Sequence, residues 1–109
     1  MVPLSPKTDL LVFAAFSGES DEFRSRIAAM LENDIGETIP FCDSSTPEEM
    51  ERIRFAVIRL LAERRMAESD VIQLAKTDWR DLLMAADFGY DTGAHLAWYF
   101  DTTRNTAHD

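Results

Sequence analysis

The four residues Thr46-Pro47-Glu48-Glu49 predict a helix start near the middle of the chain. A capping threonine precedes a proline at the first helical position and a glutamate at the third, which together form a capping box. Apolar residues then recur on one helical stripe, which holds Met50, Ile53, Val57, Leu60 and Leu61. A second flank holds Phe55, Ile58 and Ala62. Because this helix is apolar on two sides, it needs two packing partners; Arg64 and Arg65 are expected in its last turn.

Other helix starts are spread along the chain at Ser20-Asp21, Ser69-Asp70, Thr77-Asp78 and Thr92. Each places a side chain that can accept a hydrogen bond at the N-cap, usually with a carboxylate in the first turn. After Ser20 the apolar stripe comprises Phe23, Ile27, Met30 and Leu31. The stretch from Glu37 to Ser45 is interpreted as a loop. The sequence therefore predicts an all-α fold, a compact bundle of five or six short helices in a single domain, 1–109.

The two ends of the chain are interpreted as flexible tails, 1–7 and 102–109. Thr8 is then expected to cap a first element that runs from Asp9 to Phe16. The run from Leu10 to Phe16 is continuously apolar, which fits a buried helix or a buried strand. Ala14 and Ala15 favour the helix, and the strand stays open.

Charge and cysteine content limit the partners and the compartment. The chain has 20 acidic against 11 basic residues and a formal charge of -9, which disfavours nucleic acid and anionic membranes. Cys42 is the only cysteine, so no intramolecular disulfide can form. A cytoplasmic location is expected, because proteins of that reducing compartment fold without disulfides. The apolar run at Leu10 is too short for a membrane span.

The leading functional hypothesis is a non-catalytic domain that binds another protein, most simply itself, as a homodimer. The candidate interaction residues lie on the second flank of the Thr46 helix and in the C-terminal aromatic cluster, and they are Phe55, Ile58, Trp98, Tyr99 and Phe100. Aromatic residues dominate cores as well as interfaces, so the alternative is that these side chains fill the core.

A rival hypothesis is a small-ligand or enzymatic pocket around His95 and Asp91, bounded by Trp98 and Tyr99. Asp91 lies four residues before His95, close enough on a helix to orient the imidazole. Two ligands are too few for zinc, and Cys42 and His108 are distant in sequence, so no metal or other cofactor is expected. A nucleophilic enzyme is disfavoured as well, since the chain has no nucleophile elbow, phosphate loop or dinucleotide fingerprint.

A third hypothesis, a helix-turn-helix over Trp79 to Phe100, meets a chemical objection. Its second helix would contain no lysine or arginine between Thr92 and Phe100, and it would present bulky aromatic side chains to the bases.

The segments 78–88 (DWRDLLMAADF) and 94–98 (AHLAW) resemble a pattern in short uncharacterised bacterial all-helical proteins. The resemblance covers about the last third of the chain. It implies a helical fold and a bacterial, cytosolic origin. No activity is attached to the pattern, so no functional residue is carried over from it.

Overall fold

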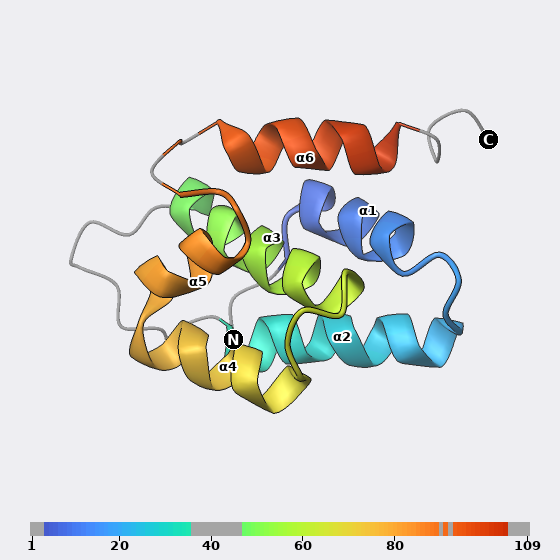
Figure 1. Ribbon diagram of the computed structural model, residues 1–109. Coiled ribbons are helices and arrows are strands. Elements are labelled where there is room, and N and C mark those ends of the chain that lie inside the picture. Colours follow the sequence, from blue (N-terminus) through green and yellow to red (C-terminus); the bar gives the residue numbers. More distant parts are fainter. Residues whose placement is uncertain (1–3, 36–46, 90, 92, 105–109) are drawn as a thin grey trace.

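The computed structural model describes residues 4–35, 47–89, 91 and 93–104, and these residues form six α-helices and no strand. The predicted all-α bundle is therefore confirmed for the described part of the chain. The helices are α1 (Pro6–Ala15), α2 (Asp21–Asp34), α3 (Pro47–Ala62), α4 (Glu68–Thr77), α5 (Trp79–Ala85) and α6 (Ala94–Thr103) (Figure 1).

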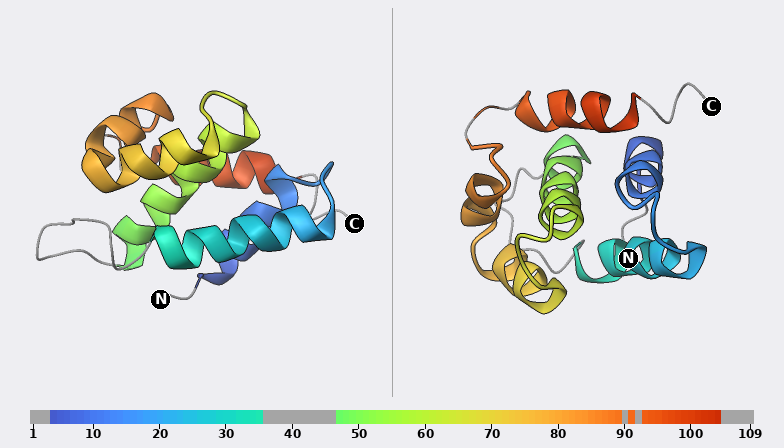
Figure 2. Two further views of the ribbon diagram at one scale, coloured as in Figure 1. Left: turned by 90° about the horizontal axis from the view of Figure 1, so that it is seen from below. Right: turned by 45° about the vertical axis from the view of Figure 1, so that its right-hand side comes forward.

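Helix α3 lies at the centre of the fold. It packs against α1, α4, α5 and α6, while α1 also packs against α2 and α6, and α4 packs against α5. The right-hand view of Figure 2 looks nearly along α3 and shows the other helices arranged around it. Every residue from Ile53 to Ile58 is buried. The sequence predicted that two partners would cover two apolar sides of this helix. Instead, four helices pack against it and bury all of its sides between Ile53 and Ile58.

Two of the predicted helix starts are confirmed in their capping geometry. The Ser20 hydroxyl accepts a hydrogen bond from the Phe23 backbone N–H at 3.1 Å, and the Asp78 carboxylate accepts one from Asp81 N–H at 3.1 Å. Helix α3 begins at Pro47, as the capping box requires. The proposed cap Thr46, the loop from Glu37 to Ser45 and Cys42 lie outside the described residues.

The predicted start of the first helix is wrong. Ser5, not Thr8, is the N-cap of α1, because its hydroxyl accepts the Thr8 N–H and Pro6 occupies the first helical position. Pro6 and Lys7 therefore belong to the helix and not to a tail. Thr8 is buried within the first turn, where its hydroxyl and that of Ser5 lie 2.8 Å apart. The run from Leu10 to Ala15 is helix, with Phe16 as its C-cap, so the strand alternative is excluded.

The ends of α3 and α5 share a left-handed C-terminal motif. Arg64 follows α3 with φ 55°, and Asp87 follows α5 with φ 65°. In each case the next N–H reaches back to the helix, from Arg65 to the Leu60 carbonyl at 2.9 Å and from Phe88 to the Leu83 carbonyl at 3.0 Å. These are Schellman motifs, built without glycine. Arg64 and Arg65 thus lie beyond the last turn of α3, contrary to the prediction.

The remaining boundaries shift by one to three residues. Helix α4 begins at Glu68 with Ala67 as a cap that makes no side-chain hydrogen bond. Helix α6 begins at Ala94, since Gly93 is its N-cap, and it continues to Thr103. Thr103 is buried and its hydroxyl donates to the Tyr99 carbonyl at 2.8 Å, so residues 102 and 103 are not part of a tail. Across the described helices, none is long and apolar enough to cross a bilayer.

Candidate functional site

Two of the predicted interaction residues belong to the core. Phe55 and Ile58 are fully buried within a single chain. The Phe55 ring stacks on Tyr99 with 5.5 Å between centroids and an interplanar angle of 18°. Neither side chain can contact a partner protein without unfolding of α3, so their assignment to an interaction surface is wrong. The reason is that α6 covers the flank of α3 that the sequence left open.

The aromatic cluster of α6 divides into a buried and an exposed part. Tyr99 is buried, and Trp98 is partly buried against Phe88, with ring centroids 6.1 Å apart. The Arg59 guanidinium of α3 lies 5.5 Å from the Trp98 ring. Of the three candidates on this helix, Phe100 alone is exposed. The core interpretation therefore holds for Tyr99, and largely for Trp98.

His95 lies in the core and does not pair with Asp91. Its side chain is 6% exposed, and its ring lies between Phe55 and Phe88, with centroids 5.6 and 6.3 Å away. Burial, assisted by the nearby charge of Arg52, lowers the pKa of His95, so the imidazole is neutral at pH 7. Asp91 is exposed and accepts a hydrogen bond from Gly93 N–H at 2.8 Å. The residues of the predicted pocket thus form packing contacts around His95.

The Nδ1 atom of His95 is buried and has no hydrogen-bond partner among the described residues. We expect His95→Leu to raise the free energy of unfolding at pH 7 by about 1 kcal/mol, because an unsatisfied buried polar atom is lost. The stability that His95→Leu gains over the wild type should be larger at pH 5 than at pH 7. The folded chain keeps His95 neutral to lower pH than the unfolded chain, so wild-type stability falls below pH 6.5 by up to about 1.4 kcal/mol per pH unit until the folded pKa is reached.

Urea titrations of both proteins at pH 7.5 and pH 5 measure this difference. Since every other titrating group is shared, the change in the difference isolates His95. An equal difference at the two pH values would show that His95 has the same pKa in the folded and unfolded chain.

The exposed surface of α1 and α6, two helices that pack against each other (Figure 1), includes large apolar side chains. Its large side chains are Leu10, Phe13 and Phe100, which are 39%, 51% and 58% exposed. At about 100° per residue, Phe100 and Trp98 lie on opposite sides of Tyr99. Trp98 faces Phe88 and Arg59, so Phe100 lies on the other side of α6, where its ring meets Tyr99 with centroids 5.1 Å apart. We call Leu10, Phe13 and Phe100 the α1–α6 face.

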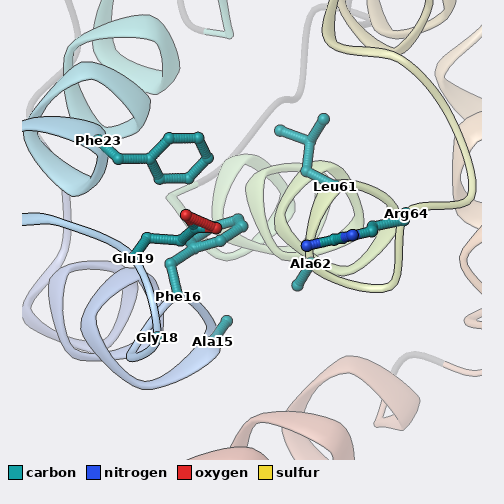
Figure 3. Close-up of a pocket in the computed structure, with 8 residues that line it drawn as sticks. All are labelled: Ala15, Phe16, Gly18, Glu19, Phe23, Leu61, Ala62 and Arg64. Atoms are coloured by element: carbon teal, nitrogen blue, oxygen red, sulfur yellow. The ribbon is translucent and has the colours of Figure 1, made fainter.

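A pocket of about 510 Å³ opens between the α1–α2 turn and the end of α3. Figure 3 shows the residues that line it, which are Ala15, Phe16, Gly18, Glu19, Phe23, Leu61, Ala62 and Arg64. The rings of Phe16 and Phe23 meet edge to face, 5.5 Å apart. The Glu19 carboxylate and the Arg64 guanidinium point toward one another across the opening. We call it the Glu19–Arg64 pocket.

Hydrogen bonds hold both rims of this pocket. Arg24 of α2 donates to the carbonyls of Phe16 at 3.0 Å and Glu19 at 2.6 Å, which fixes the α1–α2 turn, and it pairs with Asp21. On the other rim, the Schellman motif fixes Arg64 through its N–H bond to the Leu61 carbonyl at 3.1 Å. The two charged side chains thus project from backbone positions that are held in place.

The sequence predicts Phe100 of the α1–α6 face, but it predicts neither Leu10 and Phe13 nor the pocket. The two exposed residues of α1 could have been found from helical spacing, because Leu10 and Phe13 are three residues apart on the side of the helix opposite to the buried Leu11 and the partly buried Ala15. The sequence carries no signal for the pocket, since its two rims come from segments that are 38 or more residues apart in the chain. The described residues contain no cluster of three or more histidine, cysteine or acidic side chains able to hold a metal. No family model, curated protein or solved structure matches the chain.

Proposed function

We propose that this chain is a non-catalytic helical domain that forms a homodimer through the α1–α6 face. The supporting observation is that Leu10, Phe13 and Phe100 leave large apolar side chains half exposed on two helices that pack side by side. Exposed apolar side chains favour association, because contact with a partner removes them from water. The rival pocket hypothesis is weakened, since His95 at its centre lies buried between aromatic rings, which supports a structural role for this residue.

The charges beside this face favour a second copy of the chain as the partner. Lys7 lies three residues before Leu10, and Asp9 four before Phe13, so both flank the exposed side of α1. On α6, Asp101 and Arg104 adjoin Phe100 and form an ion pair at 3.5 Å. The two positive and two negative charges of Lys7, Asp9, Asp101 and Arg104 sum to zero, so this surface is locally neutral.

Two copies of a chain with charge -9 repel each other, and a locally neutral contact surface adds no further repulsion within the interface. A two-fold contact brings the same patch together from both copies, so acidic and basic side chains can pair across the axis. Nucleic acid or an anionic membrane would need a basic surface instead. The single cysteine further supports a cytoplasmic location, where structural disulfides are rare.

The dimer is tested with Phe100→Glu. We expect the wild-type mass from light scattering to rise from one chain to two across a concentration series. A carboxylate at the centre of the contact should weaken the dimer at least about 30-fold, as loss of an interface anchor does. The melting temperature of the dilute variant should stay near that of the wild type, since Phe100 is exposed in the single chain.

Met84→Glu is the matched control, because Met84 is 51% exposed and lies on α5, on the other side of α3 from α1. It should leave the dimer unchanged. A wild-type protein that stays monomeric at every concentration would refute the proposal. If Met84→Glu weakened the dimer as much as Phe100→Glu does, the contact would not be specific to α1 and α6.

A further inference from the structure

His95 places a titratable ring inside the contact between α6 and α3. The ring is buried and lies between the rings of Phe55 and Phe88. Its Nδ1 atom has no hydrogen-bond partner among the described residues. An imidazolium carries N–H groups on both ring nitrogens, so a proton taken up here places a charge and an unsatisfied donor in the core.

The charged groups that face His95 do not stabilise a proton on it. They are Arg52 and Glu51 of α3, Lys7 of α1 and Asp91 in the segment before α6. Both carboxylates accept other hydrogen bonds, Glu51 from the Ser5 hydroxyl at 2.6 Å and Asp91 from the Gly93 N–H at 2.8 Å. Burial and the two basic groups outweigh the two carboxylates, so the packed helix disfavours the imidazolium.

The position of His95 in its own helix acts in the same direction. It is the second residue of α6, whose N-cap Gly93 makes no side-chain hydrogen bond and whose first turn contains no acidic residue. A positive charge in the first turn of a helix opposes the helix dipole. Protonation therefore weakens the start of α6 as well as its contact with α3.

Helix α6 is also the helix that can leave most easily. Its buried residues form a single stripe at intervals of four, and they are His95, Tyr99 and Thr103. Two of these three side chains are polar, so the stripe buries little apolar surface for its length. Helix α3 keeps its contacts with α1, α4 and α5 when α6 is absent. Figure 2 shows α6 at the edge of the arrangement, along α1 and α3.

We propose that α6 is a proton-sensitive helix, which is released from α1 and α3 when His95 takes up a proton from the solvent. Release brings the imidazolium into water, where both of its N–H groups find acceptors. The other described helices stay folded, because local opening of a weakly packed element costs less than unfolding of the whole chain. The inference does not rest on the proposed dimer, since all the groups that carry it lie within one chain.

Hydrogen exchange of the backbone amides tests the proposal in the full chain, with exchange rates expressed as protection factors at pH 7.5 and pH 5. The released helix binds the proton with the ordinary histidine pKa of about 6.5, which allows up to about a 30-fold change in opening over this interval. We expect the protection factors of residues 98–103 to fall at least about fivefold. At pH 5 they should lie at least about tenfold below those of residues 53–60 in α3, because α3 stays folded when α6 opens.

His95→Leu and His108→Gln are the matched variants, since they replace the two histidines of the chain. His95→Leu should give α6 the same protection factors at both pH values, whereas His108→Gln should behave like the wild type. The proposal is overturned if α6 protection in the wild type does not fall, or if it falls as much in His95→Leu. Equal protection factors for α6 and α3 at pH 5 would also overturn it, because α6 would then open only with the whole fold.

Discussion

Phe55→Ala is expected to lower the free energy of unfolding by about 4 kcal/mol, within the range of 3 to 5 kcal/mol seen for buried phenylalanines. The side chain is fully buried at the centre of α3, where it stacks on Tyr99 and contacts the His95 ring. Truncation leaves a cavity between α3 and α6 that the rigid helices cannot close. Chemical denaturation followed by circular dichroism measures the loss.

Phe100→Ala is the control for this change, since it removes the same ring from an exposed position of α6. It should alter stability by no more than about 0.5 kcal/mol in the monomer. If Phe55→Ala kept the wild-type stability but changed the solution mass, Phe55 would belong to an interaction surface and not to the core. A small loss with an unchanged mass would show that the cavity between α3 and α6 collapses.

Helix starts could be predicted from the sequence because their information is local. The hydroxyl of Ser20 and the carboxylate of Asp78 bond to N–H groups three residues later, whatever the rest of the chain does. The α1 start was misplaced for an equally local reason. Ser5 followed by Pro6 is itself a strong start signal, but the prolines of the N-terminus were interpreted as marks of a tail.

Burial of particular side chains could not be predicted, because it depends on which helices pack together. The periodicity of α3 places Phe55 on a flank of the helix, yet only the position of α6 decides that this flank is covered. The same contact explains Thr103, a polar residue that is buried because α6 continues along α1 and α3. Phe100 and Tyr99 are neighbours in sequence with opposite exposures for this reason.

The candidate pocket depends on backbone conformation as well as on packing. Arg64 reaches its rim from a left-handed position, where a sequence pattern would normally show glycine or asparagine. Nothing in the residues around Arg64 indicates that conformation, and basic residues at a helix end are ordinarily interpreted as partners of the helix dipole. Glu19 points toward this rim from the α1–α2 turn, a segment far from Arg64 in the sequence (Figure 3).

Arg54→Ala is expected to lower the free energy of unfolding by about 3 kcal/mol, although arginine is usually a surface residue. Arg54 is 2% exposed within α3, and its Nε atom donates to the Ile35 carbonyl at the end of α2, 2.9 Å away. Burial lowers the pKa of this guanidinium, while Glu32 raises it. The change removes a buried, charge-assisted hydrogen bond worth about 1.5 to 3 kcal/mol, together with the packing of the aliphatic stem.

Arg54→Met separates these two contributions, because it restores most of the lost volume without the donor. It should cost less than Arg54→Ala, as apolar replacements of buried charges often do. Arg26→Ala is the matched control: Arg26 is exposed on α2 and pairs with Glu68 at 2.6 Å, so its loss should cost less than about 1 kcal/mol. Equal urea midpoints for Arg54→Ala and Arg26→Ala would show that the link from α3 to the end of α2 contributes no more to stability than a surface ion pair.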